Sequence, residues 1–276
     1  KFKRYKTCLC KNIEELAFKS TVIITCLPSP NASNEVIRSL IPYINKTHLW
    51  IEMSTTDKDE LIKVSKLIKK HGAKVLEAPI TGGEHRAKSG NISILASGER
   101  KQFNRAFPIL SMMGFKILYC GKLGNASILK VITNYLASLH LIGIGEALAV
   151  SKKYNIDLGL AYNAINISSG NSFVNETETK VILSGSYDVG FTMDLVNKDI
   201  SLFNKLANKK KIPLDFGKIL NKKFKKGMKI LGKRSFSTSI IKIIEQDCGI
   251  NMRSKNFPKK LIDNLSKQKG FEVKIK

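Results

Sequence analysis

The first 120 residues alternate short apolar runs with segments of helical periodicity. Apolar runs of strand length occur at residues 22–27, 48–53, 74–78, 92–96 and 116–120. Between them, residues 58–71 place Leu61, Val64 and Ile68 at helical spacing, and residues 101–113 form a second helical segment. Strands that alternate with helices in this way predict a parallel sheet with helices on its faces.

The pattern changes after Gly124. An almost unbroken apolar stretch runs from about Ala126 to Val150 and predicts one long helix. Further helical patterns follow at residues 158–167, 174–184, 194–209 and 216–231, and the tail from about residue 251 is charged and poorly patterned. We therefore expect an α/β fold with a partial Rossmann-type parallel-sheet domain over residues 1–123. An all-α domain over residues 124–276, built on the long interdomain helix, is expected to follow it.

The long apolar stretch is also long enough to cross a membrane. Four polar or ionisable residues are spread along it, namely Lys130, Asn134, His140 and Glu146. Such residues are costly in contact with lipid, so a helix buried between domains accounts for them better. We expect no membrane association.

Composition limits the other classes. A chain of 276 residues with 43% hydrophobic residues can bury a substantial core. Its five cysteines form no regular framework, and no histidine pairs with a cysteine at zinc-ligand spacing. No signal peptide is recognisable. These features predict a reduced, cytoplasmic protein without a metal site.

The chain carries 47 Lys and Arg against 22 Asp and Glu, a formal net charge of +25. Such a charge can attract nucleic acid or anionic lipid. Arginine, the better reader of phosphates and bases, is scarce, and the basic runs lack interleaved aromatic residues. A lysine-rich surface that favours solubility is the better interpretation, so no specific nucleic-acid partner is expected.

Lys130 and Asn134 stand one turn apart in the long apolar stretch and are expected to share a helix face. Burial disfavours an ammonium group and lowers its pKa, and a lysine of lowered pKa suits proton transfer near neutral pH. The alternative is a lysine at a helix end that keeps its ammonium group in water. The segment alone favours this alternative.

Other polar motifs follow predicted strands. Two glycines in Pro79-Ile-Thr-Gly-Gly83 allow close approach of a ligand, and Thr81 adds a hydroxyl. Ligands bind at the carboxyl ends of parallel strands, so this loop and two others are expected to converge with the lysine-bearing helix on one crevice. The pair Lys198 and Asp199, taken alone, is typical of a solvated helix face.

Several short motifs occur in a fixed order along the chain. They are Ile24-Thr-Cys-Leu-Pro28, Met53-Ser-Thr55, Glu77-Ala-Pro-Ile-Thr-Gly-Gly83, Gly121-x-x-Gly-x-x-x-x-x-Lys130-x-x-x-Asn134, Ser168-Ser-Gly170, residues 191–199 and Arg234-Ser-Phe-Ser237. In this order they resemble the β-hydroxyacid dehydrogenase family, the 6-phosphogluconate dehydrogenase-like group that contains 3-hydroxyisobutyrate dehydrogenase and tartronate semialdehyde reductase.

The resemblance implies an oxidoreductase that uses NAD or NADP on a short β-hydroxy acid such as 3-hydroxyisobutyrate. It implies a general acid/base (Lys130), a residue that orients the substrate (Asn134), binding of the substrate carboxylate (Thr81, Gly82, Gly83 and, less directly, Asn171) and cofactor contacts (Leu27, Pro28, Thr55 and Lys198). It also implies a small carboxylate substrate and assembly as a homo-oligomer.

The chain departs from the family pattern in one major respect. It contains no G-x-G-x-x-G, the loop that holds the pyrophosphate of a dinucleotide. We therefore expect an N-terminally truncated member that lacks the first β-α-β unit and binds dinucleotide poorly. Two alternatives stay open, a tartronate semialdehyde or related sugar-acid reductase and an inactive or nucleic-acid-binding protein.

Overall fold

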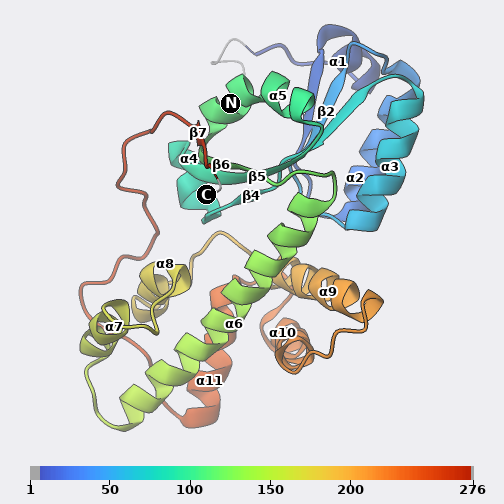
Figure 1. Ribbon diagram of the computed structural model, residues 1–276. Coiled ribbons are helices and arrows are strands. Elements are labelled where there is room, and N and C mark those ends of the chain that lie inside the picture. Colours follow the sequence, from blue (N-terminus) through green and yellow to red (C-terminus); the bar gives the residue numbers. More distant parts are fainter. Residues whose placement is uncertain (1–6, 275–276) are drawn as a thin grey trace. The chain divides into compact units, whose positions relative to one another are not determined.

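The computed structural model describes residues 7–274, which fold as two units (Figure 1). The first unit comprises residues up to Thr81, Ser93–Lys130 and the segment from Lys269 onward, and the second comprises Gly82–Ile92 and Val131–Gln268. Helix α6 (Asn125–Lys153) runs from the first unit into the second.

A seven-stranded sheet organises the described part of the first unit. Its strands are β1 (Val22–Thr25), β2 (Leu49–Glu52), β3 (Lys74–Glu77), β4 (Ile80–Thr81), β5 (Ile92–Gly98), β6 (Gly114–Tyr119) and β7 (Phe271–Glu272). The order is β1-β2-β3-β5-β6-β7, with β4 paired to β5 off this path. The helices of this unit are α1 (Ile13–Lys19), α2 (Pro30–Leu40), η2 (Ile41–Tyr43), α3 (Lys58–Lys70) and α5 (Arg100–Met113).

The sheet is mainly parallel, with one reversal. Strands β1, β2 and β3 are mutually parallel, and so are β6 and β7. In contrast, β5 runs antiparallel to both β3 and β4. The predicted Rossmann-type parallel sheet is therefore confirmed, and β5 adds antiparallel pairings to it. Only the short α4 (Gly83–Ser89) separates β4 from β5, and so brief a connection returns the chain antiparallel, whereas a parallel partner needs a longer crossover.

Both faces of the parallel strands are buried. Trp50 and Val75 pack with residues of α2 and α3, among them Ile37, Leu61 and Ile68. The alternate residues of β2 and β3, such as Leu49, Ile51 and Leu76, are also fully buried. Figure 1 shows α2 and α3 on one side of these strands and α5 on the other. Runs of apolar residues in β2 and β3 therefore reflect burial on two sides, as in other α/β sheets.

The second unit is helical and encloses its own core. Its helices are α4, α7 (Leu158–Asn166), α8 (Phe173–Leu183), α9 (Met193–Lys209), α10 (Phe216–Leu231), η3 (Ser237–Ile240) and α11 (Ile241–Cys248). Leu141 and Leu148 of α6 lie in one buried cluster with Phe224 and Ile241. A Cβ atom at Gly145 would collide with the Ile241 side chain, so this glycine allows α11 to approach α6 closely.

Helix α6 has the length and apolar composition of a membrane-spanning helix, but 39% of its most apolar window is buried inside the protein. Core helices pass the same test, so this is weak evidence for a membrane span. The apolar residues of α6 in the second unit have a clear alternative use, because they form part of that unit's core.

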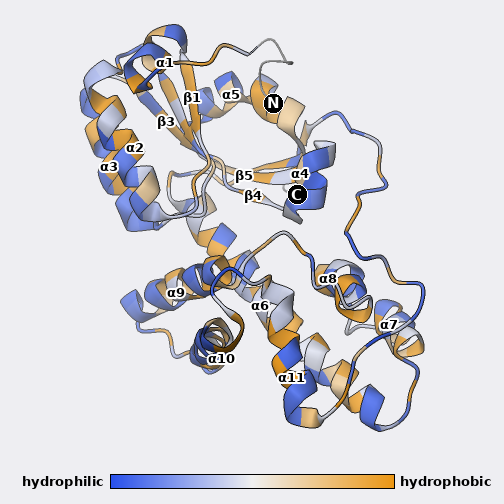
Figure 2. Ribbon diagram, turned by 180° about the vertical axis from the view of Figure 1, so that it is seen from behind, coloured by the Kyte–Doolittle hydropathy of each residue, from blue (hydrophilic) through white to orange (hydrophobic). Residues whose placement is uncertain are grey.

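The C-terminal tail contains a strand that the sequence pattern did not predict. Strand β7 pairs in parallel with β6, Phe271 packs edge-on to Phe115 at 5.2 Å, and Arg100 donates to both carboxylate oxygens of Glu272 at 2.6 and 2.7 Å. Figure 2 shows the segment between α11 and β7 as mostly hydrophilic. Residues 124–276 are therefore not wholly helical, since their last part completes the sheet of the first unit.

Candidate active site

Lys130 and Asn134 lie one turn apart on α6, at the start of the long apolar helix. Lys130 is only 7% exposed, so it is not a lysine at a helix end with its side chain in water. The Asn134 amide donates to the Asp199 carboxylate at 2.6 Å. The same carboxylate lies 3.0 Å from the ammonium group of Lys198. A buried lysine thus shares a helix with an amide whose orientation is fixed by a carboxylate.

Asp199 belongs to the candidate site, although the sequence alone indicated no role for it. It is 2% exposed, whereas its pattern on α9 suggested a solvated face. The signal that could have revealed it is its place directly after Lys198 in a stretch that resembles the family. Spacing within α9 alone could not reveal it, because its partner Asn134 is 65 residues away.

Loops that follow β1 and β2 meet at the carboxyl edge of the parallel strands. The Leu27 amide donates to the Ser54 hydroxyl at 2.7 Å, which joins the two loops. Pro28 is exposed and Thr55 partly exposed. Behind them, the buried Glu52 carboxylate accepts the Ser54 amide at 2.8 Å. The first two strand-end loops therefore converge as predicted, and both expose residues expected to contact a cofactor.

The turn after β4 requires its two glycines. Gly82 has φ 123° and Gly83 has φ 85°, values that side-chain-bearing residues rarely adopt. Thr81 ends β4, and Gly83 begins α4. The two consecutive glycines therefore let the chain turn directly from strand to helix beside the Thr81 hydroxyl.

Helix α4, which follows this turn, is held by the C-terminal tail. Asp263 accepts the Ser89 hydroxyl at 2.6 Å and the Asn91 amide at 2.9 Å. Asn91 also donates to the main-chain oxygens of Leu265 and Ser266, each at 3.2 Å. The tail thus acts as a strap over the segment that leads out of the glycine turn.

This strap is expected to loosen in acid. The hydrogen bonds from Ser89 and then Asn91 lower the pKa of Asp263. Because a lowered folded-state pKa stabilises the fold above the unfolded value of about 4, that contribution is lost as pH falls below about 4. Hydrogen exchange of residues 83–91, measured from pH 5 to pH 2.5 against Asp263→Asn, should show protection that fades only in the native sequence. Equal pH dependence in both proteins would contradict this account.

Asn171 has a structural use. Its amide nitrogen donates to Glu176 at 2.9 Å, and its oxygen accepts the Ser172 amide at 2.8 Å and the Asn175 side chain at 3.1 Å. These bonds organise the start of α8. They account for Asn171 without a substrate, so a role in substrate binding stays a prediction.

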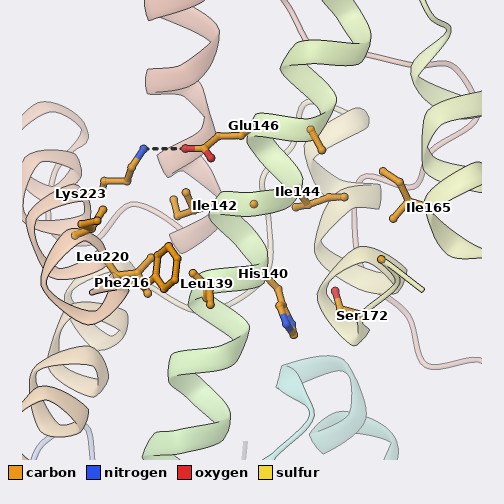
Figure 3. Close-up of a pocket in the computed structure, with 14 residues that line it drawn as sticks. Leu139, His140, Ile142, Ile144, Glu146, Ile165, Ser172, Phe216, Leu220 and Lys223 are labelled. Atoms are coloured by element: carbon orange, nitrogen blue, oxygen red, sulfur yellow. Dashed lines mark hydrogen bonds and ion pairs between the residues drawn. The ribbon is translucent and has the colours of Figure 1, made fainter. Parts of the chain in front are cut away.

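A pocket of about 630 Å³ lies elsewhere in the second unit (Figure 3). It is lined mainly by apolar residues of α6 and α10, including Leu139, Phe216 and Leu220. Lys223 and Glu146 form an ion pair of 3.1 Å beside it. None of the residues assigned to chemistry lines this pocket.

Two family models match the chain. The NAD binding domain of 6-phosphogluconate dehydrogenase matches residues 1–121, and a model described as NAD-binding of NADP-dependent 3-hydroxyisobutyrate dehydrogenase matches residues 124–244. A domain of a nicotinamide-dependent dehydrogenase is therefore followed by the helical domain that accompanies it.

Curated relatives of the chain include two dehydrogenases of hydroxy acids. The mitochondrial 3-hydroxyisobutyrate dehydrogenase of Rattus norvegicus is 31% identical over 74% of this chain and 64% of its own length. The 2-(hydroxymethyl)glutarate dehydrogenase of Eubacterium barkeri is 27% identical over 88% of this chain and 82% of its own length. The chain thus spans slightly less than two thirds of the rat enzyme that it matches.

Solved structures share the fold. A Mycobacterium tuberculosis 3-hydroxyisobutyrate dehydrogenase with L-serine superposes with a TM-score of 0.75 at 23% identity, covering 85% of this chain and 83% of that chain. A 3-hydroxyisobutyrate dehydrogenase from Salmonella typhimurium gives 0.77 at 21% identity, with 84% and 82% covered. Fold and family matches together define a dehydrogenase-type protein with a Rossmann-type sheet and a helical domain. The chain belongs to the β-hydroxyacid dehydrogenase family.

Proposed function

We propose that this protein catalyses reversible, NAD- or NADP-dependent oxidation of a short β-hydroxy acid, with 3-hydroxyisobutyrate as the first candidate. The observation that carries the proposal is the buried Lys130, one turn from an Asn134 amide fixed by Asp199, in a chain of this family. The rat and Eubacterium relatives are named as dehydrogenases of hydroxy acids, which supports this substrate class.

Lys130 acts as the general acid/base in this proposal. It takes the proton of the substrate hydroxyl during oxidation and returns it to the carbonyl oxygen during reduction. Asn134 orients that oxygen, because one N–H of its amide is held by Asp199 and the other can donate to the substrate oxygen. Thr81, Gly82 and Gly83 bind the substrate carboxylate through a hydroxyl and main-chain amides.

The residues present fit the nicotinamide part of a cofactor. Leu27 and Pro28 offer apolar surface, Thr55 a hydroxyl, and the loops that carry them lie at the carboxyl edge of the parallel strands. When bound, the cofactor supplies or accepts the hydride. Lys198 is assigned to the same cofactor contact, with its charge balanced by Asp199. The assay described next, which follows both NADH and NADPH, distinguishes NAD from NADP.

The test is a substrate panel with the purified full chain. We would follow NADH and NADPH absorbance with 3-hydroxyisobutyrate, 2-(hydroxymethyl)glutarate, glycerate and serine, and with tartronate semialdehyde in reduction. Turnover of 3-hydroxyisobutyrate or 2-(hydroxymethyl)glutarate supports the proposal. A preference for glycerate and tartronate semialdehyde would move the protein to the sugar-acid branch, and no turnover with any pair would remove the proposal.

We also propose that the protein is a cytoplasmic homo-oligomer. Phe216 and Ile219 beside the apolar pocket are 56% and 50% exposed, which is unfavourable in water unless another surface covers them. A second copy of the chain is the simplest partner to cover these residues. Light scattering of the native protein and of Phe216→Lys would show whether the assembly depends on this surface.

The proposed cytoplasmic location rests on the cysteines. None of the five forms a disulfide, as suits a reducing compartment.

A further inference from the structure

Glu77, the last residue of β3, places a buried carboxylate at the start of α6. It is 0% exposed. One of its oxygens accepts the Ser97 hydroxyl and the Gly124 amide, and the other accepts the amide of Ser127 at 3.0 Å and the Ser127 hydroxyl. Four donors from β5 and from the beginning of α6 thus meet on one side chain, all within the first unit.

These bonds satisfy groups that a helix cannot satisfy itself. The first amides of a helix have no partner within it, and they form the positive end of its dipole. Glu77 supplies both an acceptor and a negative charge at that end of α6. Lys130 follows Ser127 by three residues and so lies on the same helix face, one turn further along.

The pattern of donors shows that Glu77 binds as a carboxylate. Each of its oxygens faces a main-chain N–H, which can only donate. Ser97 accepts the Ala126 amide at 3.2 Å, so its own proton is available for Glu77. The pKa of Glu77 is raised above its usual value, because burial has a larger effect than the opposing hydrogen bonds from Ser127, Ser97 and the two amides. Burial and then the nearby Glu77 raise the pKa of the Cys120 thiol to about 11.

We propose that Glu77 is the positioning residue for Lys130: its carboxylate fixes the start of α6 to the end of β3, and its charge sets the environment in which the lysine exchanges its proton. The inference rests on the proposed function of Lys130 as acid/base. It assigns to the first residue of the Glu77-Ala-Pro-Ile-Thr-Gly-Gly83 motif a task distinct from the substrate binding proposed for Thr81, Gly82 and Gly83.

Glu52 provides a matched comparison. It is the register partner of Glu77 on the neighbouring strand, is 1% exposed, and accepts the Ser33 hydroxyl and the Ser54 amide. Its recorded partners lie in α2 and the loop after β2, and none belongs to α6. Glu52→Gln should therefore affect the cofactor-side loop, whereas Glu77→Gln should affect Lys130.

The experiment compares wild type, Glu77→Gln and Glu52→Gln by three measurements. The first is kcat and KM across pH with the pair that gives turnover. The second is the pH dependence of acetic-anhydride acylation at Lys130, read by peptide mass spectrometry. The third is hydrogen exchange of residues 124–130. Acylation and exchange do not need turnover, so they test Glu77 even if every substrate fails and the proposed function falls.

Glu77→Gln should lower kcat by about tenfold to a hundredfold with little change in the cofactor KM. Loss of the negative charge disfavours the ammonium form, so the acylation midpoint at Lys130 should move to lower pH by about 0.5 to 1. Exchange at Gly124 and Ser127 should accelerate, while Glu52→Gln leaves the midpoint and this exchange unchanged.

An unchanged acylation midpoint in folded Glu77→Gln, or an equal shift in Glu52→Gln, would overturn the inference. Should Glu77→Gln fail to fold, Ser97→Ala is a milder variant, because it removes one donor to Glu77 and the acceptor of the Ala126 amide. It should accelerate exchange at residues 124–127 and lower kcat about threefold. No change in either quantity would contradict the proposal.

Discussion

Lys130→Met is expected to lower kcat/KM by about 10³-fold or more while the protein stays folded. General acid/base catalysis contributes roughly 10² to 10⁴ in rate, and methionine cannot exchange a proton. Methionine matches the lysine stem in length and is apolar, so the 7% exposed position should remain filled without a cavity. Steady-state kinetics in both directions, with circular dichroism and thermal unfolding of each variant, would measure the two effects separately.

Two controls separate proton transfer from charge. Lys130→Arg keeps a positive charge, but its guanidinium stays protonated and cannot act as a base, so it should be nearly as inactive as the methionine variant. In Lys130→Ala, added ethylamine should restore part of the rate, because it fills the space with a titratable amine. Activity within about threefold of wild type in folded Lys130→Met would remove the proposed mechanism.

The sequence predicts the positions of helices and strands better than it predicts which strands pair. Hydrophobic periodicity is local, and it placed α10 at Phe216–Leu231 and the start of α6 within one residue of Asn125. Strand β7 was not predicted, because its two residues, Phe271 and Glu272, are too few to show a hydrophobic periodicity. Their position depends on a partner strand more than 150 residues away, namely β6.

The residues of the candidate site could be proposed from the sequence where they belong to short motifs. Lys130 and Asn134 share a helix, and Gly82 and Gly83 adopt the positive φ values that only glycine adopts easily. Glu77 and Asp199 were not assigned roles, because each acts on a distant segment. The carboxylate of Glu77 reaches Ser127, fifty residues away, and that contact exists only once the sheet and α6 have assembled.

Asp199→Asn is the second variant for which we expect a large effect. The carboxylate is 2% exposed, accepts the Asn134 amide at 2.6 Å, and lies 3.0 Å from the Lys198 ammonium group. An asparagine fills the same volume but removes the charge and can present an amide where Asn134 needs an acceptor. We expect kcat/KM to fall by about tenfold to a hundredfold, because Asn134 is no longer held for the substrate oxygen. The free energy of unfolding should fall by about 1 to 3 kcal/mol.

Asp194→Asn, on the same helix, is the matched control. Asp194 pairs at 3.2 Å with Arg234, whose side chain is 75% exposed, and such surface pairs contribute roughly 0 to 1 kcal/mol. Kinetics and urea denaturation of the two variants should therefore diverge, with Asp194→Asn close to wild type. If both variants behave alike, the Asp199 carboxylate is merely one more charge on α9. If only Asp199→Asn loses activity, the orientation of Asn134 is part of the machinery, and the double variant with Asn134→Ala should be no worse than Asn134→Ala alone.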